Sequence, residues 1–220
     1  MASRVWKTKL LVMALTAISG APASAVTVFS LTESAAFGTG AYGTVTLTQN
    51  GASEVDVSVA LTSGFRFLET GGPHDAFTFN LPTVAGYTVT GITATQDLTP
   101  IVRTAHPYVW LQPGSNPAYG AYTDKLECSA CGNGGSKAFA NALSFQVNLA
   151  GLTESSFQTN TGGYSFSADL WRASDGLTGA VAAKDGIIIP SGVVPEPETY
   201  AMMLAGLAAL GFIGRRRQNA

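Results

Sequence analysis

The sequence predicts a mainly β protein: a single antiparallel β-sandwich or jelly-roll-like domain, flanked by an N-terminal signal helix and a C-terminal transmembrane helix. Three observations support this. Only 12% of the 220 residues are charged, and low charge with many small and β-favouring residues is typical of an exported β protein. Short alternating apolar runs are separated by turn residues. An apolar segment stands near each end, which divides the chain into residues 1–25, 26–190 and 191–220.

Residues 1–25 have the three parts of a secretory signal peptide. The segment MASRVWKTK is basic, residues 10–18 are apolar, and Ala23-Ser24-Ala25 has the small-x-small cleavage pattern. The apolar part is far shorter than the roughly 20 residues that span a bilayer, which disfavours an uncleaved anchor. We expect export by the Sec machinery and cleavage after Ala25.

Residues 26–190 are predicted to form the extracytoplasmic β-sandwich domain. In YGTVTLTQNGASEVDVSVAL, apolar and polar residues alternate on both sides of the turn Asn50-Gly51, which predicts a hairpin with one buried face. No segment of this part has an apolar stripe at helical spacing over ten or more residues. Further strands are expected in FTFNL, GYTVTGITATQ, PYVWLQ, LSFQVNL and YSFSADLWRA.

Two cysteines, Cys128 and Cys131, lie in the Gly-rich stretch DKLECSACGNGGSKAF. In an oxidising compartment we expect them to form a local disulfide. A redox-active pair would need a helix N-terminus, which the glycines that follow do not favour. Zinc would need two more ligands, and His74 and His106 are the only histidines. We therefore expect no metal and no cofactor, although calcium on sandwich loops stays open.

The charge and the candidate catalytic residues favour no enzyme class. Once both basic ends are removed the middle is acidic, so we expect no nucleic-acid partner. His74-Asp75 suggests a hydrolase, but Gly-x-Ser-x-Gly is missing from the sequence, and adjacent strand residues point opposite ways. Acidic residues could include a glycosidase pair, which the sequence cannot select. Five aromatic residues could instead form a sugar-stacking surface or pack in the sandwich: Tyr108, Trp110, Tyr119, Tyr122 and Trp171.

The last segment, residues 191–220, combines a Pro-Glu-Pro triplet, an uncharged apolar run and three arginines. Pro195 and Pro197 hold Glu196 in an extended conformation, which suits a protease cleft. As a helix, residues 200–214 would cover about 22 Å, and flanking residues with snorkelling arginines would extend this toward the roughly 30 Å hydrocarbon core. By the positive-inside rule, Arg215, Arg216 and Arg217 should stay on the cytoplasmic side as a stop-transfer cluster.

This arrangement resembles the PEP-CTERM sorting signal of Gram-negative bacteria. The resemblance covers about the last tenth of the chain and rests on VPEPETYAM (194–202), LAGL (204–207), LGF (210–212) and RRR (215–217). It implies an exported protein that the tail holds transiently in the inner membrane. The membrane enzyme exosortase would then process it at the strip Pro195-Glu196-Pro197, and it would reach the outer surface or extracellular matrix. It also implies a link to exopolysaccharide, biofilm or floc formation.

Three functions fit these observations. The favoured one is a non-enzymatic envelope or matrix protein, without catalytic residues, that is sorted through its tail. The second is a carbohydrate-binding module for exopolysaccharide, which should show an exposed aromatic strip. The third is a secreted hydrolase, which should show converging carboxylates or a serine–histidine pair.

Overall fold

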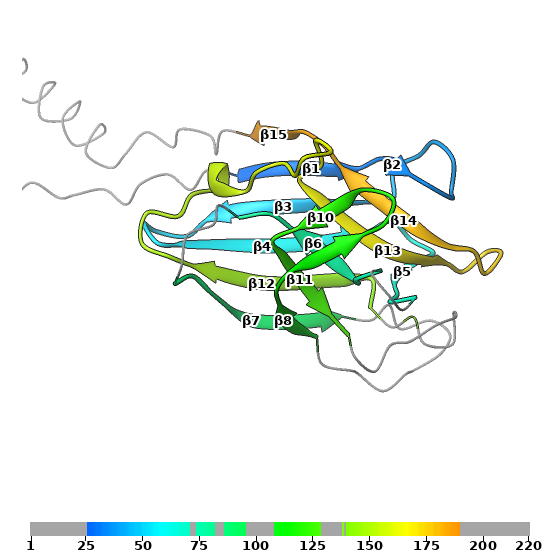
Figure 1. The fold of residues 1–220 in the computed structure, drawn as a ribbon, viewed down its shortest axis with the longest axis horizontal. Coiled ribbons are helices and arrows are strands. Elements are labelled where there is room, and N and C mark those ends of the chain that lie inside the picture. Colours follow the sequence, from blue (N-terminus) through cyan, green and yellow to red (C-terminus); the bar gives the residue numbers. More distant parts are fainter. Residues whose placement is uncertain are drawn as a thin grey trace, which may run out of the picture. The chain divides into compact units, whose positions relative to one another are not determined.

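The computed structural model describes residues 26–70, 74–81, 86–95, 108–128, 138 and 140–189. All of them belong to one compact unit, residues 23–191. They form fifteen β-strands and a short 3₁₀ turn, η1 (Glu154–Ser156) (Figure 1). The described part is therefore mainly β, as predicted from the sequence. The predicted terminal helices fall outside the described residues.

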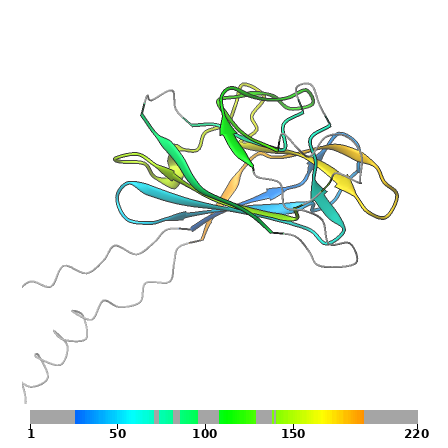
Figure 2. The same cartoon turned by 90° about the horizontal axis from the view of Figure 1, so that it is seen from below.

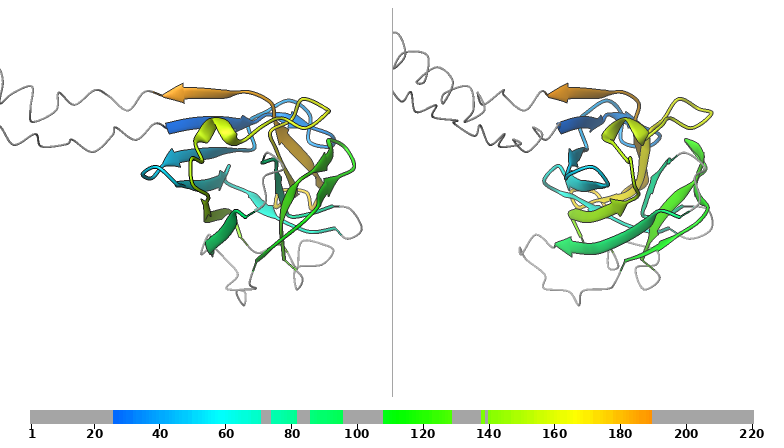
Figure 3. Two further views of the ribbon diagram at one scale, coloured as in Figure 1. Left: turned by 60° about the vertical axis from the view of Figure 1, so that its left-hand side comes forward. Right: turned by 90° about the vertical axis from the view of Figure 1, so that its left-hand side faces the viewer.

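The first sheet has six antiparallel strands in the order β15-β1-β3-β4-β12-β7. The first and last strands of the described chain, β1 and β15, lie side by side at one edge, where Val26 is paired with Ile189 (Figure 3). The bounds are β1 Val26–Leu31, β3 Gly43–Gln49, β4 Glu54–Leu61, β7 Thr88–Thr95, β12 Ala142–Asn148 and β15 Gly186–Ile189.

The second sheet is also antiparallel and has the order β2-β14-β13-β6-β11-β8, with β5 pairing against β13 as well. A separate two-stranded ribbon is formed by β9 and β10. The bounds are β2 Glu33–Ser34, β5 Phe65–Phe67, β6 Phe77–Phe79, β8 Val109–Leu111, β9 Gly114–Asn116, β10 Gly120–Tyr122, β11 Asp124–Glu127, β13 Phe166–Arg172 and β14 Thr178–Ala183.

The two sheets pack face to face around one aromatic and aliphatic core (Figure 2). Phe77 of β6 stacks on Phe166 at 5.9 Å and meets Phe145, from the first sheet, at 6.2 Å between ring centroids. Phe29 of β1 packs edge-on against Phe166 at 4.8 Å. Burying each such ring stabilises the fold by about 1.5–3 kcal/mol. The strand order does not by itself confirm a jelly roll, so that finer assignment stays a prediction.

The predicted hairpin is confirmed as β3 and β4. Their register runs from Gly43 opposite Leu61 to Gln49 opposite Val55. The inward valines and leucine of the alternating pattern are 0–1% exposed, while the threonines between them face outward. Gly51 adopts φ +74° in the turn, a conformation that glycine adopts without strain.

The β9–β10 ribbon covers the outer face of the second sheet. Tyr119 and Tyr122 pack there against alanines of β14. Beneath them the hydroxyls of Thr78 and Ser167 are hydrogen-bonded at 2.6 Å and fully buried. Gly114 allows the close approach, since a Cβ there would lie 2.4 Å from the Asp124 carbonyl oxygen. Both faces of β6 are therefore covered, which explains why all three of its residues are buried.

Candidate functional site

The sorting and processing residues predicted from the sequence lie outside the described residues. They are Ala23 and Ala25 at the expected signal cleavage, Pro195, Glu196 and Pro197 in the strip, and Arg215, Arg216 and Arg217 after the apolar run. Within residues 26–189, as far as they are described, no helix has the length and apolarity needed to cross a membrane. The roles given to these residues stay predictions.

The Gly-rich cysteine loop begins at a residue that the structure holds firmly. Cys128 is fully buried, and its backbone N–H donates to Oε2 of Glu69 at 2.9 Å. Cys131 lies outside the described residues. The Cys128–Cys131 disulfide therefore stays a prediction.

The residue Glu69 carries a perturbed carboxyl group. Burial raises its pKa to about 7, and the negative charges of Glu127 and Asp75 act in the same direction, against the hydrogen bond from Cys128. Folding therefore favours the protonated form of Glu69. The stability that this protonation contributes is present at low pH and is lost as the pH rises from about 4.5 to about 7.

Replacing Glu69 by glutamine should weaken this pH dependence. Glutamine keeps an acceptor for the Cys128 N–H but cannot ionise, so Glu69→Gln should gain stability relative to wild type as the pH rises through this window. We expect a gain of about 1 kcal/mol, once solvent screening of a half-buried group is allowed for. Denaturant unfolding at a pH below 5 and at a pH above 7 measures it, with Glu154→Gln as the control for net charge. If the stability difference between Glu69→Gln and wild type is the same at both pH values, the raised pKa of Glu69 is contradicted.

The side chains of His74 and Asp75 have different neighbours in the structure. Asp75 accepts hydrogen bonds from Nζ of Lys125 at 2.9 Å and from the Ser115 backbone N–H at 2.7 Å. These contacts hold β9 and β11 together, which is a structural role. The hydrolase interpretation gains no support from Asp75.

A different carboxylate, Asp169 of β13, interacts with His74. Burial raises the pKa of Asp169, while the hydrogen bonds from Thr70 and, to a smaller extent, the charge of His74 act in the opposite direction. Asp169 Oδ2 accepts the backbone N–H and the hydroxyl of Thr70, at 2.8 and 2.7 Å. Nδ1 of His74 is buried, and among the described residues it has no hydrogen-bond partner. The hydrolase therefore stays one of the alternatives predicted from the sequence.

Asp124, a buried carboxylate at the start of β11, joins β8 and β11 of the second sheet to the residue that precedes β7 of the first sheet. It is 0% exposed and accepts hydrogen bonds from Tyr87, Trp110, Gln112 and Thr123. The hydroxyl of Tyr87 lies 2.8 Å from both carboxylate oxygens. Burial, together with this hydrogen bond, raises the pKa of Tyr87 and keeps the hydroxyl a donor. With its acceptor sites engaged, Asp124 is a structural centre.

The aromatic residues do not form an exposed strip. Tyr108, Tyr119 and Tyr122 are 6%, 7% and 3% exposed. Trp110 is half-buried and points its Nε1 to Asp124, and Trp171 is half-buried on β13. Of the two alternatives for these aromatics, the three tyrosines take the packing role, against the β9–β10 ribbon and the sheet edge.

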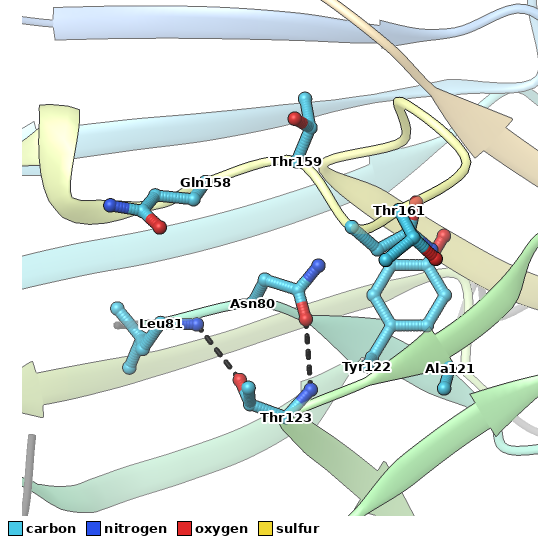
Figure 4. Close-up of a pocket in the computed structure, with 9 residues that line it drawn as sticks. Asn80, Leu81, Ala121, Tyr122, Thr123, Gln158, Thr159 and Thr161 are labelled. Carbon is cyan, nitrogen blue, oxygen red and sulfur yellow. Dashed lines mark hydrogen bonds between the residues drawn. The ribbon is translucent and has the colours of Figure 1, made fainter. Parts of the chain in front are cut away.

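A pocket of about 590 Å³ opens beside these tyrosines (Figure 4). It lies between the end of β6, the junction of β10 with β11, and the loop that precedes β13. Its lining carries amides, hydroxyls and apolar groups, and no charged side chain: Asn80, Leu81, Ala121, Tyr122, Thr123, Gln158, Thr159, Asn160 and Thr161.

Asn80 forms the floor of this pocket and is 6% exposed. Its Oδ1 accepts the Thr123 backbone N–H at 2.8 Å, which fixes the orientation of the amide. Its Nδ2 is buried without a hydrogen-bond partner and is turned toward the loop that carries Thr159 and Thr161 (Figure 4). The pocket therefore has an unused donor at its base.

The loop on the other side is held in place by Asn160. Oδ1 of Asn160 accepts the N–H groups of Gly162 and Tyr164, at 2.9 and 3.0 Å. Its Nδ2 donates to the Tyr119 carbonyl at 2.8 Å, which joins the loop to the β9–β10 ribbon. Gln158, Thr159 and Thr161 are exposed at the rim. The sequence analysis did not select this pocket, because its residues are common polar types from three distant segments.

In the described part of the chain, no group of three or more His, Cys, Asp or Glu residues is placed to hold a metal ion.

The comparisons with known proteins bear on the C-terminal end of the chain. Residues 193–218 match the family model of the PEP-CTERM protein-sorting motif. The chain carries a PEP-CTERM sorting signal. No curated protein and no solved structure matches the chain. The motif marks an exosortase-dependent exported protein with a membrane-anchoring C-terminal tail, as the resemblance implied.

Proposed function

We propose that this PEP-CTERM protein is a non-enzymatic component of the cell envelope or extracellular matrix, associated with exopolysaccharide, biofilm or floc formation. The observation that carries the proposal is the matched motif at residues 193–218. It follows directly on a folded domain whose last strand, β15, ends at Ile189. Cleavage near Pro195-Glu196-Pro197 would therefore remove no strand of the described domain. In this proposal the domain is the part that is exported, and the tail is the sorting signal.

The two ends of the domain support the same sequence of events. Val26 and Ile189 are paired on adjacent strands, so the described chain begins and ends at one edge of the first sheet. During Sec export both flanking segments could then be held by the inner membrane while the domain folds outside. Signal peptidase would cut after Ala25, exosortase would cut at the Pro-Glu-Pro strip, and the domain would leave for the outer surface or matrix.

The contacts of two buried carboxylates favour a binding or structural role for the domain over a catalytic one. Asp75 accepts hydrogen bonds from Ser115 of β9 and Lys125 of β11, and Asp124 accepts one from Gln112, just after β8. A glycosidase needs two carboxyl groups that face each other across a substrate. The contacts of these two residues commit them to the fold.

The experiment compares the source bacterium with a strain that lacks the gene. We expect the deletion strain to form less floc or biofilm, and the wild-type protein to be recovered with the exopolysaccharide fraction. Complementation with the chain truncated after Gly192 should not restore either result, although every strand of the domain is retained. Unchanged matrix in the deletion strain, with wild-type protein recovered only in the inner membrane, would contradict the proposal.

A further inference from the structure

We propose that the pocket between Asn80 and the Gln158–Thr161 loop binds a neutral, hydroxyl-rich sugar unit of a glycan. This inference rests on the proposed function and names what the matrix protein would hold. Three observations carry it: the neutral polar lining, the unused donor of Asn80, and the exposed hydroxyls and amide at the rim.

The lining selects against charged ligands. Its polar groups are amides and hydroxyls, and it holds no Lys, Arg, Asp or Glu. An anionic sugar or phosphate would lose its hydration there without a cation to replace it. A neutral sugar presents hydroxyls that both donate and accept, which is what amides and threonine hydroxyls can satisfy. The volume, about 590 Å³, lies within the usual range for small-ligand sites.

Asn80 is the group that most needs a ligand. Buried polar atoms are nearly always hydrogen-bonded, and an unpaired donor in the interior destabilises the fold. The Asn80 Nδ2 has no partner, while its Oδ1 is fixed by the Thr123 N–H at 2.8 Å. The amide is therefore held in one orientation, with its buried nitrogen turned toward the loop that carries Thr159 and Thr161 (Figure 4). A sugar hydroxyl placed between Asn80 and the loop would accept from this amide.

The opposite wall supplies further contacts without rearrangement. Gln158 donates its backbone N–H to the Asn80 carbonyl at 3.2 Å, so the loop is attached to the end of β6. Asn160 acts as a positioning residue, since its side chain is used in holding the loop and the Tyr119 turn. Gln158, Thr159 and Thr161 then present exposed side chains at the mouth. Because the mouth is open at the surface, an internal unit of a polymer can enter as well as a chain end.

Recognition would depend on hydrogen bonds and not on an exposed aromatic platform. Tyr122 lines the pocket but is only 3% exposed. Burial raises its pKa to about 12, against the influence of the Ser167 and Thr78 hydroxyls, so its hydroxyl stays protonated. Binding should consequently be weak for one sugar unit.

The direct test is an NMR titration of the mature protein purified from culture. The probes are glucose, galactose, mannose, rhamnose and N-acetylglucosamine, together with the neutral exopolysaccharide fraction of the same strain. At least one probe should shift the Asn80 and Gln158 side-chain amides and the Thr159 and Thr161 backbone signals. The acidic exopolysaccharide fraction should not. If no probe shifts the Asn80 amide, its donor is satisfied by water alone and the proposal is wrong.

Two variants make the test specific. Asn80→Asp keeps the acceptor for the Thr123 N–H and removes the donor. Thr159→Ala/Thr161→Ala removes two rim hydroxyls at exposed positions, so it should fold normally. Each should weaken binding by about tenfold, the effect expected for one or two lost hydrogen bonds. The matched control, Thr44→Ala/Thr88→Ala, removes two exposed threonine hydroxyls elsewhere and should bind as wild type.

The outcomes separate this proposal from the broader one. If wild type and both variants are all recovered with exopolysaccharide and bind the probes equally, the pocket is not the binding site, while the matrix role stands. If wild type is not recovered with exopolysaccharide but the titration still maps to Asn80, the matrix role fails and the pocket stands.

Discussion

Replacing Asp124 by alanine is expected to lower the free energy of unfolding by about 3–5 kcal/mol, because it leaves several donors unpaired around a buried site. Tyr87, Trp110, Gln112 and Thr123 all direct hydrogen bonds to this carboxylate. Denaturant unfolding measures the loss. In a thermal melt it should lower Tm by about 10 °C.

A graded series separates this effect from simple loss of charge. Asp124→Asn keeps one acceptor oxygen for Trp110 and Gln112, and the rotatable hydroxyls of Tyr87 and Thr123 can accept from the new amide. Its cost should therefore be smaller, about 1–2 kcal/mol. Asp185→Ala, at an exposed position, is the control and should stay within about 0.5 kcal/mol of wild type. A loss below 1 kcal/mol for Asp124→Ala would contradict the structural role.

Replacing Pro195, Glu196 and Pro197 together by alanine is expected to stop release of the protein. The prolines keep the strip extended, and alanines would let the membrane helix continue outward and hide the cleavage site. The precursor should accumulate in the inner membrane, and little should reach the medium or matrix. Western blots of membrane and released fractions measure this.

The matched control for the strip lies just outside the motif. Pro190→Ala/Ser191→Ala changes the connection between β15 and the motif, and release should continue. Normal release of the triple variant would show that the strip is not what exosortase recognises.

The sequence predicted the strands whose side chains alternate clearly. β3 and β4 are visible because valine and leucine alternate with threonine and acidic residues around Asn50-Gly51. β14, TGAVAA, was not among the predicted strands because alanine and glycine have weak strand preference. Its place is decided by packing, since small residues let the β9–β10 ribbon approach the sheet.

Of the two candidate sites, the sequence could predict the sorting signal and could not predict the pocket. The sorting signal is local, so contiguous residues and their order identify it, and the family match at residues 193–218 confirms the recognition. The sugar pocket is not local. Asn80, Thr123 and Gln158 come from different parts of the sequence and meet only after the second sheet forms. Their residue types are common in loops, so no signal in the sequence could have selected them.

The aromatic residues show why residue type alone was insufficient. Tyr119 and Tyr122 are compatible with a sugar platform or with packing, and only the covering ribbon decides between them. The role of Asp124 could not be predicted either, because the sequence does not show which acidic residues face each other as a glycosidase pair. In the structure Asp124 is buried and accepts hydrogen bonds from four side chains, which gives it a structural role.

The central claim, that the tail is an address that exosortase removes, is tested most directly by the intact mass of the released protein. In cells with exosortase, the mass should correspond to a chain that begins at Val26 and ends near the Pro195-Glu196-Pro197 strip. In cells without exosortase, the protein should stay in the membrane with the tail attached. Released protein that carries the full tail, in the same amount with and without exosortase, would contradict the claim and leave an ordinary C-terminal anchor.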